Sequence, residues 1–289
     1  MSPKNILLVY KKSAYEIYFL NKSSSLFSRL PVLSARDKKR FKKAHLEHYR
    51  TVYFIEQVLR KNKLGYKKIA RGQKADFSPH DLIITVGGDG TLLDAARETR
   101  TQFILGVNSD PKRSIGRLCS VTRQDFQKNI RKIISGDFRI VKLHRLKLSF
   151  SRNIEPVCLL NDLLVCHENP ASMSRYRLTI NGLMEDQRSS GLWISAAAGS
   201  SGAIHSAGGR ILTLHSAHVQ YMPRELYSHG KEKYHLKGGV VSLKRPIIVK
   251  SLMRQGAVYV DGAHLQFPFE FNDTIKITHS PQPLSVIRI

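Results

Sequence analysis

Five residues, Gly87-Gly88-Asp89-Gly90-Thr91, combine the features of a phosphate-binding turn with a single carboxylate. They follow an apolar run over 81–86 and precede a helical pattern over 91–100. Glycines let the backbone approach a ligand closely, and the amides at a helix start attract phosphate. Thr91 could cap the helix or bond a phosphate. Asp89 would repel phosphate, so it suits a role in accepting a proton from an attacking hydroxyl or in holding a metal. A plain Gly-Asp-Gly turn is the alternative.

A second polar feature is Asn161-Asp162, which interrupts the apolar run 157–165. Buried polar side chains are costly unless they form hydrogen bonds. A ribose diol would satisfy these two residues, and so would a local turn.

A third feature is the segment 187–210, in which 16 of 24 residues are Gly, Ala or Ser. Between 189 and 209 no side chain is charged, and His205 is the only ionisable group. So little bulk leaves backbone amides and hydroxyls open to a flat polar ligand, although a tightly packed strand and turn would have the same composition. A lone histidine such as His205 is more often structural than catalytic.

Several common signatures are missing from the sequence. It contains no GxxxxGK[ST], GxGxxG, GxSxG, HExxH or CxxC pattern. These absences argue against a Walker-type nucleotidase, an ordinary dinucleotide-binding Rossmann site, a nucleophile elbow and a zinc site. Three cysteines, an odd number, indicate a reducing compartment.

Strand and helix patterns alternate in the first half of the chain. Apolar strand-like runs lie at 5–10, 81–86 and 103–107, and helical patterns lie at 35–63, 91–100 and 123–134. Gly65 and Gly136 are expected to end the first and third helices. The alternation predicts a three-layer, Rossmann-like α/β domain with a parallel sheet over residues 1–138.

The second half has short strand-like runs separated by Gly, Pro, Asn and Asp, and it predicts an all-β domain over 139–289. The runs are 142–150, 157–165, 176–180, 193–196, 240–242, 247–250, 258–260, 274–278 and 284–287.

The length of 289 residues suits two domains. No run of 18 apolar residues is present, which argues against a membrane span. The net charge is +25, and residues 36–74 hold 14 Lys and Arg against three acidic residues. We interpret this basic run as mainly a solvated helix face, with polyanion binding as the alternative. The start of the sequence shows no leader pattern, so a cytoplasmic location is expected, with an organellar one left open if the chain has been trimmed.

The order of these features resembles the NAD kinase family, and most closely its mitochondrial type. That family belongs to a superfamily with diacylglycerol and sphingosine kinases and phosphofructokinases. GGDGT is shared across the superfamily. The more specific resemblance is carried by 106–111 (GVNSDP) with 113–116, by 172–176, by 189–192, and by 260–262 followed by 269–273.

The resemblance implies an α/β domain plus a β-rich domain, with the active site between them. It implies an ATP-dependent NAD kinase that phosphorylates the 2′-hydroxyl of the adenosine ribose to give NADP, with Mg²⁺ arriving on ATP and Asp89 as the catalytic acid-base residue. The residues expected to contact ATP phosphates are Gly87, Gly88, Gly90, Thr91, Asn108, Lys112 and Arg113. The residues expected to bind NAD are Asn161, Asp162, Ser190, Gly199, Ser200, Ser201 and Ser206. A homo-oligomer, dimer or tetramer, is also implied.

The chain departs from the common bacterial pattern of this family at three places. Ser190 stands where an aspartate is usual, a feature shared with the mitochondrial type. Residues 196–203 read AAAGSSGA in place of Thr-Pro-Thr-Gly-Ser-Thr-Ala-Tyr, and Arg117 stands where phenylalanine often follows glycine.

Two alternatives remain at this level. A lipid kinase of the same superfamily would need an apolar groove for acyl chains. A non-catalytic dinucleotide- or RNA-binding protein would use the positive charge. Aromatic residues are not interleaved with the basic run in the manner of RNA-recognition modules, so neither nucleic acid nor a membrane is expected as a partner.

Overall fold

The computed structural model describes residues 3–20, 34–228, 233–263 and 265–289. The chain divides into two compact units, which are described separately below. Unit 1 comprises residues 1–141 together with 285–289, and unit 2 comprises residues 142–284.

Unit 1 is built on a largely parallel sheet with the order β2-β1-β3-β4-β19-β6, in which β5 also pairs with β4. The pairings β1/β2, β1/β3, β3/β4, β4/β5 and β4/β19 are all parallel. Every residue of the central strand β3 is buried, as expected for a strand that is covered on both faces. The strands are β1 (Ile6–Tyr10), β2 (Tyr66–Ala70), β3 (Leu82–Gly87), β4 (Phe103–Asn108), β5 (Val121–Thr122), β6 (Arg139–Leu143) and β19 (Leu284–Arg288).

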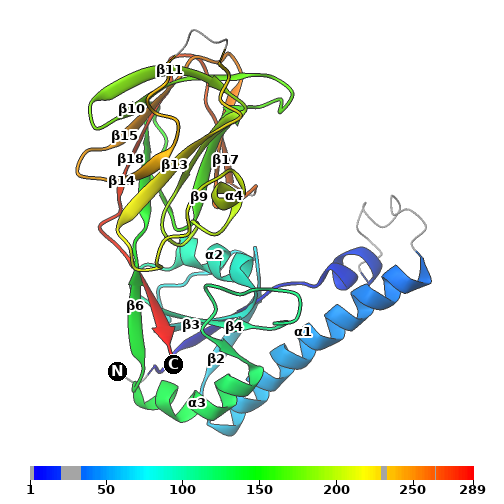
Figure 1. The fold of residues 1–289 in the computed structure, drawn as a ribbon. Helices are drawn as coiled ribbons and strands as arrows, with labels where there is room; N and C mark the ends of the chain where they lie inside the picture. The colour runs from blue at the N-terminus through cyan, green and yellow to red at the C-terminus, as the bar shows by residue number, and fades with distance from the viewer. Residues whose placement is uncertain (1–2, 21–33, 229–232, 264) are drawn as a thin grey trace. The chain divides into compact units, whose positions relative to one another are not determined.

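Helices cover both faces of this sheet (Figure 1). α1 (Ala35–Lys61) and α3 (Arg123–Ser135) lie on one face, and α2 (Asp89–Glu98) lies on the other. The apolar faces of α1 and α3 pack with β1, β3 and β4 in one continuous core. This is the predicted three-layer α/β arrangement.

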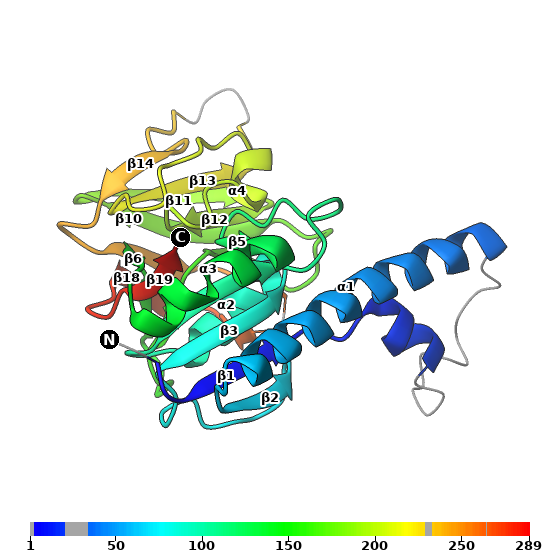
Figure 2. The ribbon, with the colours of Figure 1, turned by 90° about the horizontal axis from the view of Figure 1, so that it is seen from below.

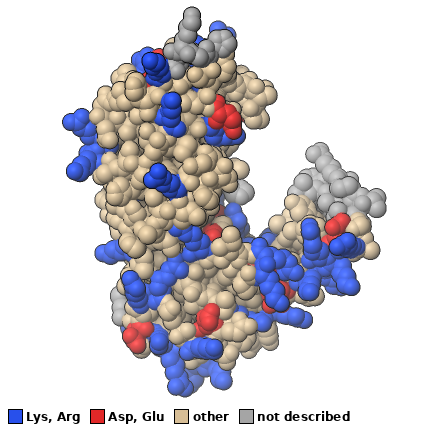
Figure 3. Space-filling model, viewed as in Figure 1, with Lys and Arg blue, Asp and Glu red and all other residues tan. Residues whose placement is uncertain are grey.

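Helix α1 is longer than the sheet that it covers. All of its buried residues lie between His48 and Leu59, so its N-terminal half extends past the sheet beside the short helix η1 (Glu16–Leu20; Figure 2). The basic side chains at 36–43 on this half are exposed, as predicted for a solvated helix face (Figure 3). No helix among the described residues is long and apolar enough to cross a membrane.

Unit 2 consists mainly of two antiparallel six-stranded sheets, ordered β11-β10-β15-β18-β7-β8 and β14-β13-β12-β9-β16-β17. Buried side chains from both sheets form a single apolar core. One four-residue helix, α4 (Ala203–Ser206), lies in the Gly/Ala/Ser segment. The strands are β7 (Leu146–Phe150), β8 (Val157–Leu159), β9 (Asp162–His167), β10 (Ser174–Ile180), β11 (Leu183–Ser189), β12 (Gly191–Ser195), β13 (His218–Arg224), β14 (Gly239–Ser242), β15 (Ile247–Ser251), β16 (Gly256–Val260), β17 (Leu265–Pro268) and β18 (Thr274–His279).

Three sequence predictions about the elements are wrong. The last five residues do not belong to the β-rich domain, because β19 adds to the α/β sheet beside β4. The predicted strand 157–165 is two strands in two different sheets, β8 and β9. The predicted run 142–150 is likewise split, because β6 belongs to unit 1's sheet and β7 to unit 2's.

Helix ends are only partly as predicted. Gly136 ends α3 in the left-handed conformation, with φ of 75°, as expected. α1 instead ends at Lys61, and the left-handed residue after it is Lys63, not Gly65. The patterns also missed β2, β5, β11, β13 and β17, and β2 shows that part of the basic run is a strand.

Candidate functional site

The GGDGT turn joins the carboxyl end of β3 to the start of α2. Gly88 is the N-cap of α2 and has no side chain to cap the helix, so the predicted capping role of Thr91 is wrong. Thr91 is buried, and a Cβ on Gly87 would overlap its hydroxyl. A Cβ on Gly88 would lie 2.6 Å from Ser114 Oγ. Both glycines are therefore required by close packing around the turn.

The first amides of α2 are open at this turn. The amides of Thr91 and Leu92 both donate hydrogen bonds to the Gly88 carbonyl. This leaves the amides of Asp89 and Gly90 for a ligand or water, as is usual at a helix start. The guanidinium of Arg71 lies beside them, because a Cβ on Gly90 would be 3.3 Å from Arg71 Nη1. Sequence reasoning missed Arg71, which is one cation among many in a basic run.

The Asp89 carboxylate is held by the backbone of a neighbouring loop. Its Oδ2 accepts a hydrogen bond from the Arg117 amide at 3.0 Å, and its Oδ1 accepts one from the Leu118 amide at 2.8 Å. An ionised carboxylate offers about four lone pairs, so each oxygen can still accept another proton or hydrogen bond. Asp89 is half-buried, and its oxygens are fixed in direction.

A second arginine from β19 supports the loop that binds Asp89. Arg288 Nη1 donates to the Cys119 carbonyl at 2.9 Å, and Nη2 donates to the Arg117 carbonyl at 3.4 Å. Burial, followed by the negative charge of Asp89, raises the pKa of the Cys119 thiol to about 12, so the thiol remains protonated. No sequence pattern singled out Arg288.

Asn108 is committed to the loop that follows β4. Its Nδ2 donates to the Ser114 carbonyl at 3.0 Å, and its Oδ1 accepts from the Asp110 amide at 3.1 Å. Gly116 packs so closely on the Asn108 amide that a Cβ there would overlap it. The Asn108 side chain therefore has a structural role in this loop, and its expected phosphate contact stays a prediction.

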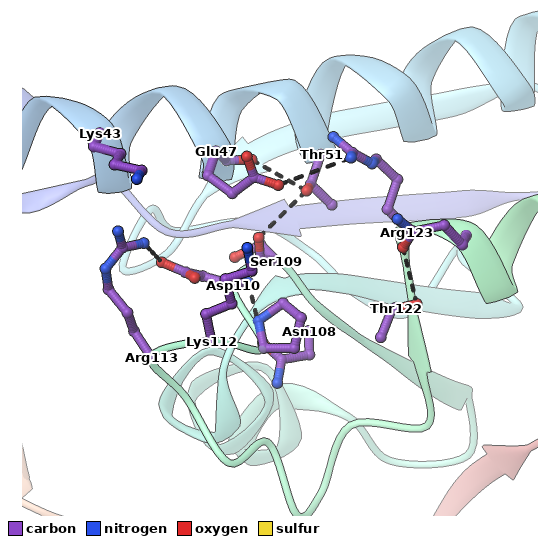
Figure 4. Close-up of a pocket in the computed structure, with 12 residues that line it drawn as sticks. Lys43, Glu47, Thr51, Asn108, Ser109, Asp110, Lys112, Arg113, Thr122 and Arg123 are labelled. Atoms are coloured by element: carbon purple, nitrogen blue, oxygen red, sulfur yellow. Dashed lines mark hydrogen bonds and ion pairs between the residues drawn. The ribbon is translucent and has the colours of Figure 1, made fainter.

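Lys112 and Arg113 lie in a cavity beside α1 and α3 (Figure 4). Arg113 Nη1 pairs with Asp110 Oδ2 at 2.6 Å. Residues 87–91 do not line this cavity, although Ser109 of its lining donates its amide to the Gly87 carbonyl at 2.9 Å. The phosphate contacts expected of Lys112 and Arg113 stay a prediction.

In unit 2, Asn161 and Asp162 lie where the chain passes from one sheet to the other. This corner leaves two backbone amides without a ladder partner, and the carboxylate of Asp261 accepts both. The distances are 3.1 Å from the Leu160 amide and 2.7 Å from the Asn161 amide. Asp261 directly follows β16 and has a left-handed φ of 48°. The local turn considered from the sequence is thus present.

Asp162 is a buried carboxyl group beside a second one. It is 5% exposed. Burial, and then the charge of Asp261, raises the pKa of Asp162 to about 7. Asn161 Nδ2 lies 3.3 Å from Asp162 Oδ2. Near neutral pH this carboxyl group can therefore either donate or accept a hydrogen bond.

The middle of the Gly/Ala/Ser segment, residues 195–202, packs against this corner. The Ala196 amide and the Ser195 hydroxyl both donate to the Asn161 carbonyl, at 2.9 and 3.1 Å. A Cβ on Gly199 would overlap the same carbonyl, and one on Gly202 would lie 3.6 Å from Asp162 Oδ2. The structure thus brings Asn161, Asp162 and Gly199 together.

The serines predicted to bind NAD differ in their surroundings. Ser200 is fully buried; it donates to the Ala197 carbonyl at 2.7 Å and accepts from the Leu212 amide at 2.9 Å. Ser201 and Ser206 are exposed. Ser190 precedes β12 at the end opposite Ser195, which pairs with Asp162, about 16 Å away along the strand. Ser190 is therefore not brought to this corner.

His205 has the structural role that its isolation in the sequence suggested. Its Nδ1 lies 2.8 Å from the Gly209 carbonyl, within the turn that closes α4.

Comparisons with known proteins place the chain in a family. The model of the ATP-NAD kinase N-terminal domain matches residues 16–138. A rice protein (Oryza sativa subsp. japonica) named "Probable NADH kinase" is 32% identical over 83% of this chain and 81% of its own length. The chain belongs to the NAD kinase family. The NADH kinase of Arabidopsis thaliana is also 32% identical, over 83% of each chain.

The fold class is confirmed by a solved structure. An NAD kinase from Archaeoglobus fulgidus, crystallised with ATP, superposes with a TM-score of 0.72 over 98% of this chain and 93% of its own. At 22% sequence identity this likeness concerns the fold alone.

Proposed function

We propose that the chain is an ATP-dependent NAD kinase that transfers the γ-phosphoryl group of Mg-ATP to the 2′-hydroxyl of the adenosine ribose of NAD, giving NADP and ADP. The observation that carries this proposal is the Asp89 carboxylate, fixed by two backbone amides at a helix start with open N–H groups. The family, and the NADH kinase names of the rice and Arabidopsis relatives, support it over the lipid kinase alternative.

In the proposed reaction the turn binds phosphate and Asp89 handles the proton. The open amides of Asp89 and Gly90 and the guanidinium of Arg71 would hold phosphate oxygens of ATP. The ribose oxygen attacks the γ-phosphorus, the bond to the ADP oxygen breaks, and the hydroxyl proton passes to the Asp89 carboxylate. General-base help of this kind contributes roughly 10²–10⁴-fold in rate. Mg²⁺ would arrive with ATP and neutralise charge on its phosphates.

The corner at Asn161 and Asp162 is the proposed place for the dinucleotide. A carboxyl group with a pKa of about 7 suits a ribose hydroxyl, which can donate or accept a hydrogen bond. The exposed hydroxyls of Ser201 and Ser206 would contact the ligand. Gly199 would act indirectly, because it lets the segment pack on the Asn161 backbone.

The direct test is an assay of the purified chain with NAD and Mg-ATP, in which NADP is read by an NADP-specific dehydrogenase. We expect NADP to form and its formation to stop when the magnesium is chelated. A folded protein that forms no NADP from NAD or NADH would refute the proposal.

NADH is a second candidate acceptor. The rice and Arabidopsis relatives, each aligned over 83% of this chain, both carry the name NADH kinase. Measuring kcat/KM for NADH and NAD in parallel decides between the two acceptors, and a ratio above one would assign NADH as the preferred substrate.

We further infer a homo-oligomer, dimer or tetramer, from the family resemblance, and a reducing compartment such as the cytoplasm from the three free cysteines. Light scattering after gel filtration tests the first inference.

A further inference from the structure

Unit 1 contains a cavity that the proposed reaction does not use, and we refer to it as the loop–helix cavity. It has a volume of about 310 Å³ and lies between α1, the loop after β4 and the start of α3 (Figure 4). It is lined by Lys43, Glu47, Thr51, Asn108, Ser109, Asp110, Pro111, Lys112, Arg113, Thr122, Arg123 and Gln124.

The charges around the loop–helix cavity do not balance. Four cations, Lys43, Lys112, Arg113 and Arg123, face two carboxylates. Asp110 pairs with Arg113 at 2.6 Å, and Glu47 lies 3.8 Å from Arg123.

The two lysines are the source of the imbalance. Within the described part of the chain, neither Lys43 nor Lys112 has an acidic partner within 4 Å. The cavity therefore has an excess of positive charge that nothing in its own lining neutralises.

The cavity wall is held in place by buried polar contacts. Burial, and then the charge of Lys11, lowers the pKa of His48 to about 4, so its ring is neutral. Its Nε2–H donates to the Lys11 carbonyl at 2.8 Å, which leaves Nδ1 to accept from the Ser109 hydroxyl at 2.9 Å. Thr51 Oγ1 lies 3.3 Å from the Ser109 carbonyl. These hydrogen bonds fix the loop after β4 to α1. A ligand that enters the cavity therefore does not have to order the loop when it binds.

The start of α3 adds a third wall. Thr122 and Asp125 form a capping box there, which fixes the first turn and places Arg123 at its head. The cations thus come from three separate segments: Lys43 from α1, Lys112 and Arg113 from the loop, and Arg123 from α3. Cations that converge on a concave site from several elements suit a compact, multiply charged anion.

We propose that the loop–helix cavity, whose lining does not include the residues of the GGDGT turn, binds a small phosphate monoester. The planar guanidinium of Arg113 can take two phosphate oxygens while the two lysines supply point charges. The volume is larger than one phosphate needs and lies at the lower end of the range for small-ligand sites. The remainder of the ligand would lie against Pro111 and the polar groups of Thr122 and Gln124.

The test is equilibrium binding to the full chain by calorimetry, with glucose 6-phosphate as the probe and glucose and inorganic phosphate as comparisons. We expect glucose 6-phosphate to bind with a Kd below about 1 mM, glucose not to bind, and inorganic phosphate to bind more weakly.

The test variant carries Lys43→Gln and Arg123→Gln. The matched control variant carries Lys42→Gln and Arg131→Gln. The control pair lies on the same two helices, removes the same charge and does not line the cavity. The cavity variant removes two charged donors that would bond the phosphate, so it should weaken binding at least tenfold, and the control should weaken it less than twofold.

Three results would overturn the proposal. If the control variant weakens glucose 6-phosphate binding as much as the cavity variant does, the anion is attracted only by the general positive charge of the surface. If inorganic phosphate binds as tightly as the monoester, the site belongs to free phosphate. A raised KM for ATP in the cavity variant would make the cavity part of the donor site. These results do not depend on which nucleotide the chain phosphorylates, because the binding arm needs no activity.

Discussion

Asp89 has two proposed roles: it holds the Arg117–Leu118 loop, and it accepts the hydroxyl proton. The substitution Asp89→Asn should affect both roles, and the structure predicts the size of each effect. The carboxylate accepts hydrogen bonds from the amides of Arg117 and Leu118. An asparagine oxygen can accept one of them, but its NH₂ group would face the other amide, donor against donor. The cost of losing one charge-assisted bond is about 1.5–3 kcal/mol. For a unit of this size, that corresponds to a melting temperature lower by roughly 4–10 °C.

The catalytic effect is predicted independently. If Asp89 accepts the hydroxyl proton, kcat should fall by about 10²-fold or more, which is roughly 2.7 kcal/mol in barrier. The assay is steady-state NADP formation at a temperature well below the variant's transition, with the folded fraction measured by circular dichroism. Glu98→Gln, an exposed change at the other end of α2, is the matched control and should alter neither quantity.

Two results would refute this reasoning. A variant that melts within about 1 °C of the wild type would show that the loop does not depend on the carboxylate. A folded variant that retains more than about a third of the wild-type kcat would make Asp89 structural, with Asp162 the next candidate for the base.

Three further predictions concern the supporting residues. Burial raises the folded-state pKa of Asp162 to about 7, so the contribution of this carboxyl group to the free energy of unfolding is present below about pH 4 and is lost as the pH rises through about 7, at up to about 1.4 kcal/mol per pH unit. Urea unfolding of Asp162→Asn should lack this loss. Identical pH profiles for the variant and the wild type would contradict the prediction. Gly199→Ala should lower the free energy of unfolding, measured in urea, by about 1–3 kcal/mol, because the new Cβ would overlap the Asn161 carbonyl. Gly65→Ala, where a Cβ would meet open space, should leave that free energy nearly unchanged. Equal losses in the two variants would refute the packing argument. Arg288→Gln should speed hydrogen exchange at the Arg117 and Leu118 amides by about tenfold or more, because two bonds to the loop backbone are lost, and unchanged protection would show that Arg288 is dispensable.

The architecture was largely predictable because hydrophobic periodicity reports burial. Apolar runs such as 81–86 became β3, and the pattern over 123–134 became α3 with its glycine end. The pattern does not say which sheet a strand joins. The run 284–287 therefore read as one more strand of the β-rich half, although it pairs with β4.

The site was predictable where residue type and local geometry coincide. Gly87 is required by its contact with Thr91, which is close in sequence, whereas Gly88 packs on Ser114 of a later loop. Lys112 and Arg113 have the charge that phosphate needs, but the direction of their loop depends on Asn108 and its bonds to Ser114 and Asp110.

The residues that sequence reasoning missed are brought in by long-range folding. Arg71 and Arg288 come to the turn and its loop from strand ends that are remote in sequence. A lone arginine carries no local signature, so nothing short of the tertiary structure identifies it.

The return of the chain to its first sheet has a consequence for the order of assembly. Unit 2 is inserted between β6 and β19, so during translation all of its strands are synthesised before β19. Domains usually fold in the order in which they are made. Here the first unit keeps an open sheet edge beside β4 while the second completes its core. Arg288 belongs to β19, so the brace behind the Asp89 loop forms only after the whole of unit 2 has been synthesised.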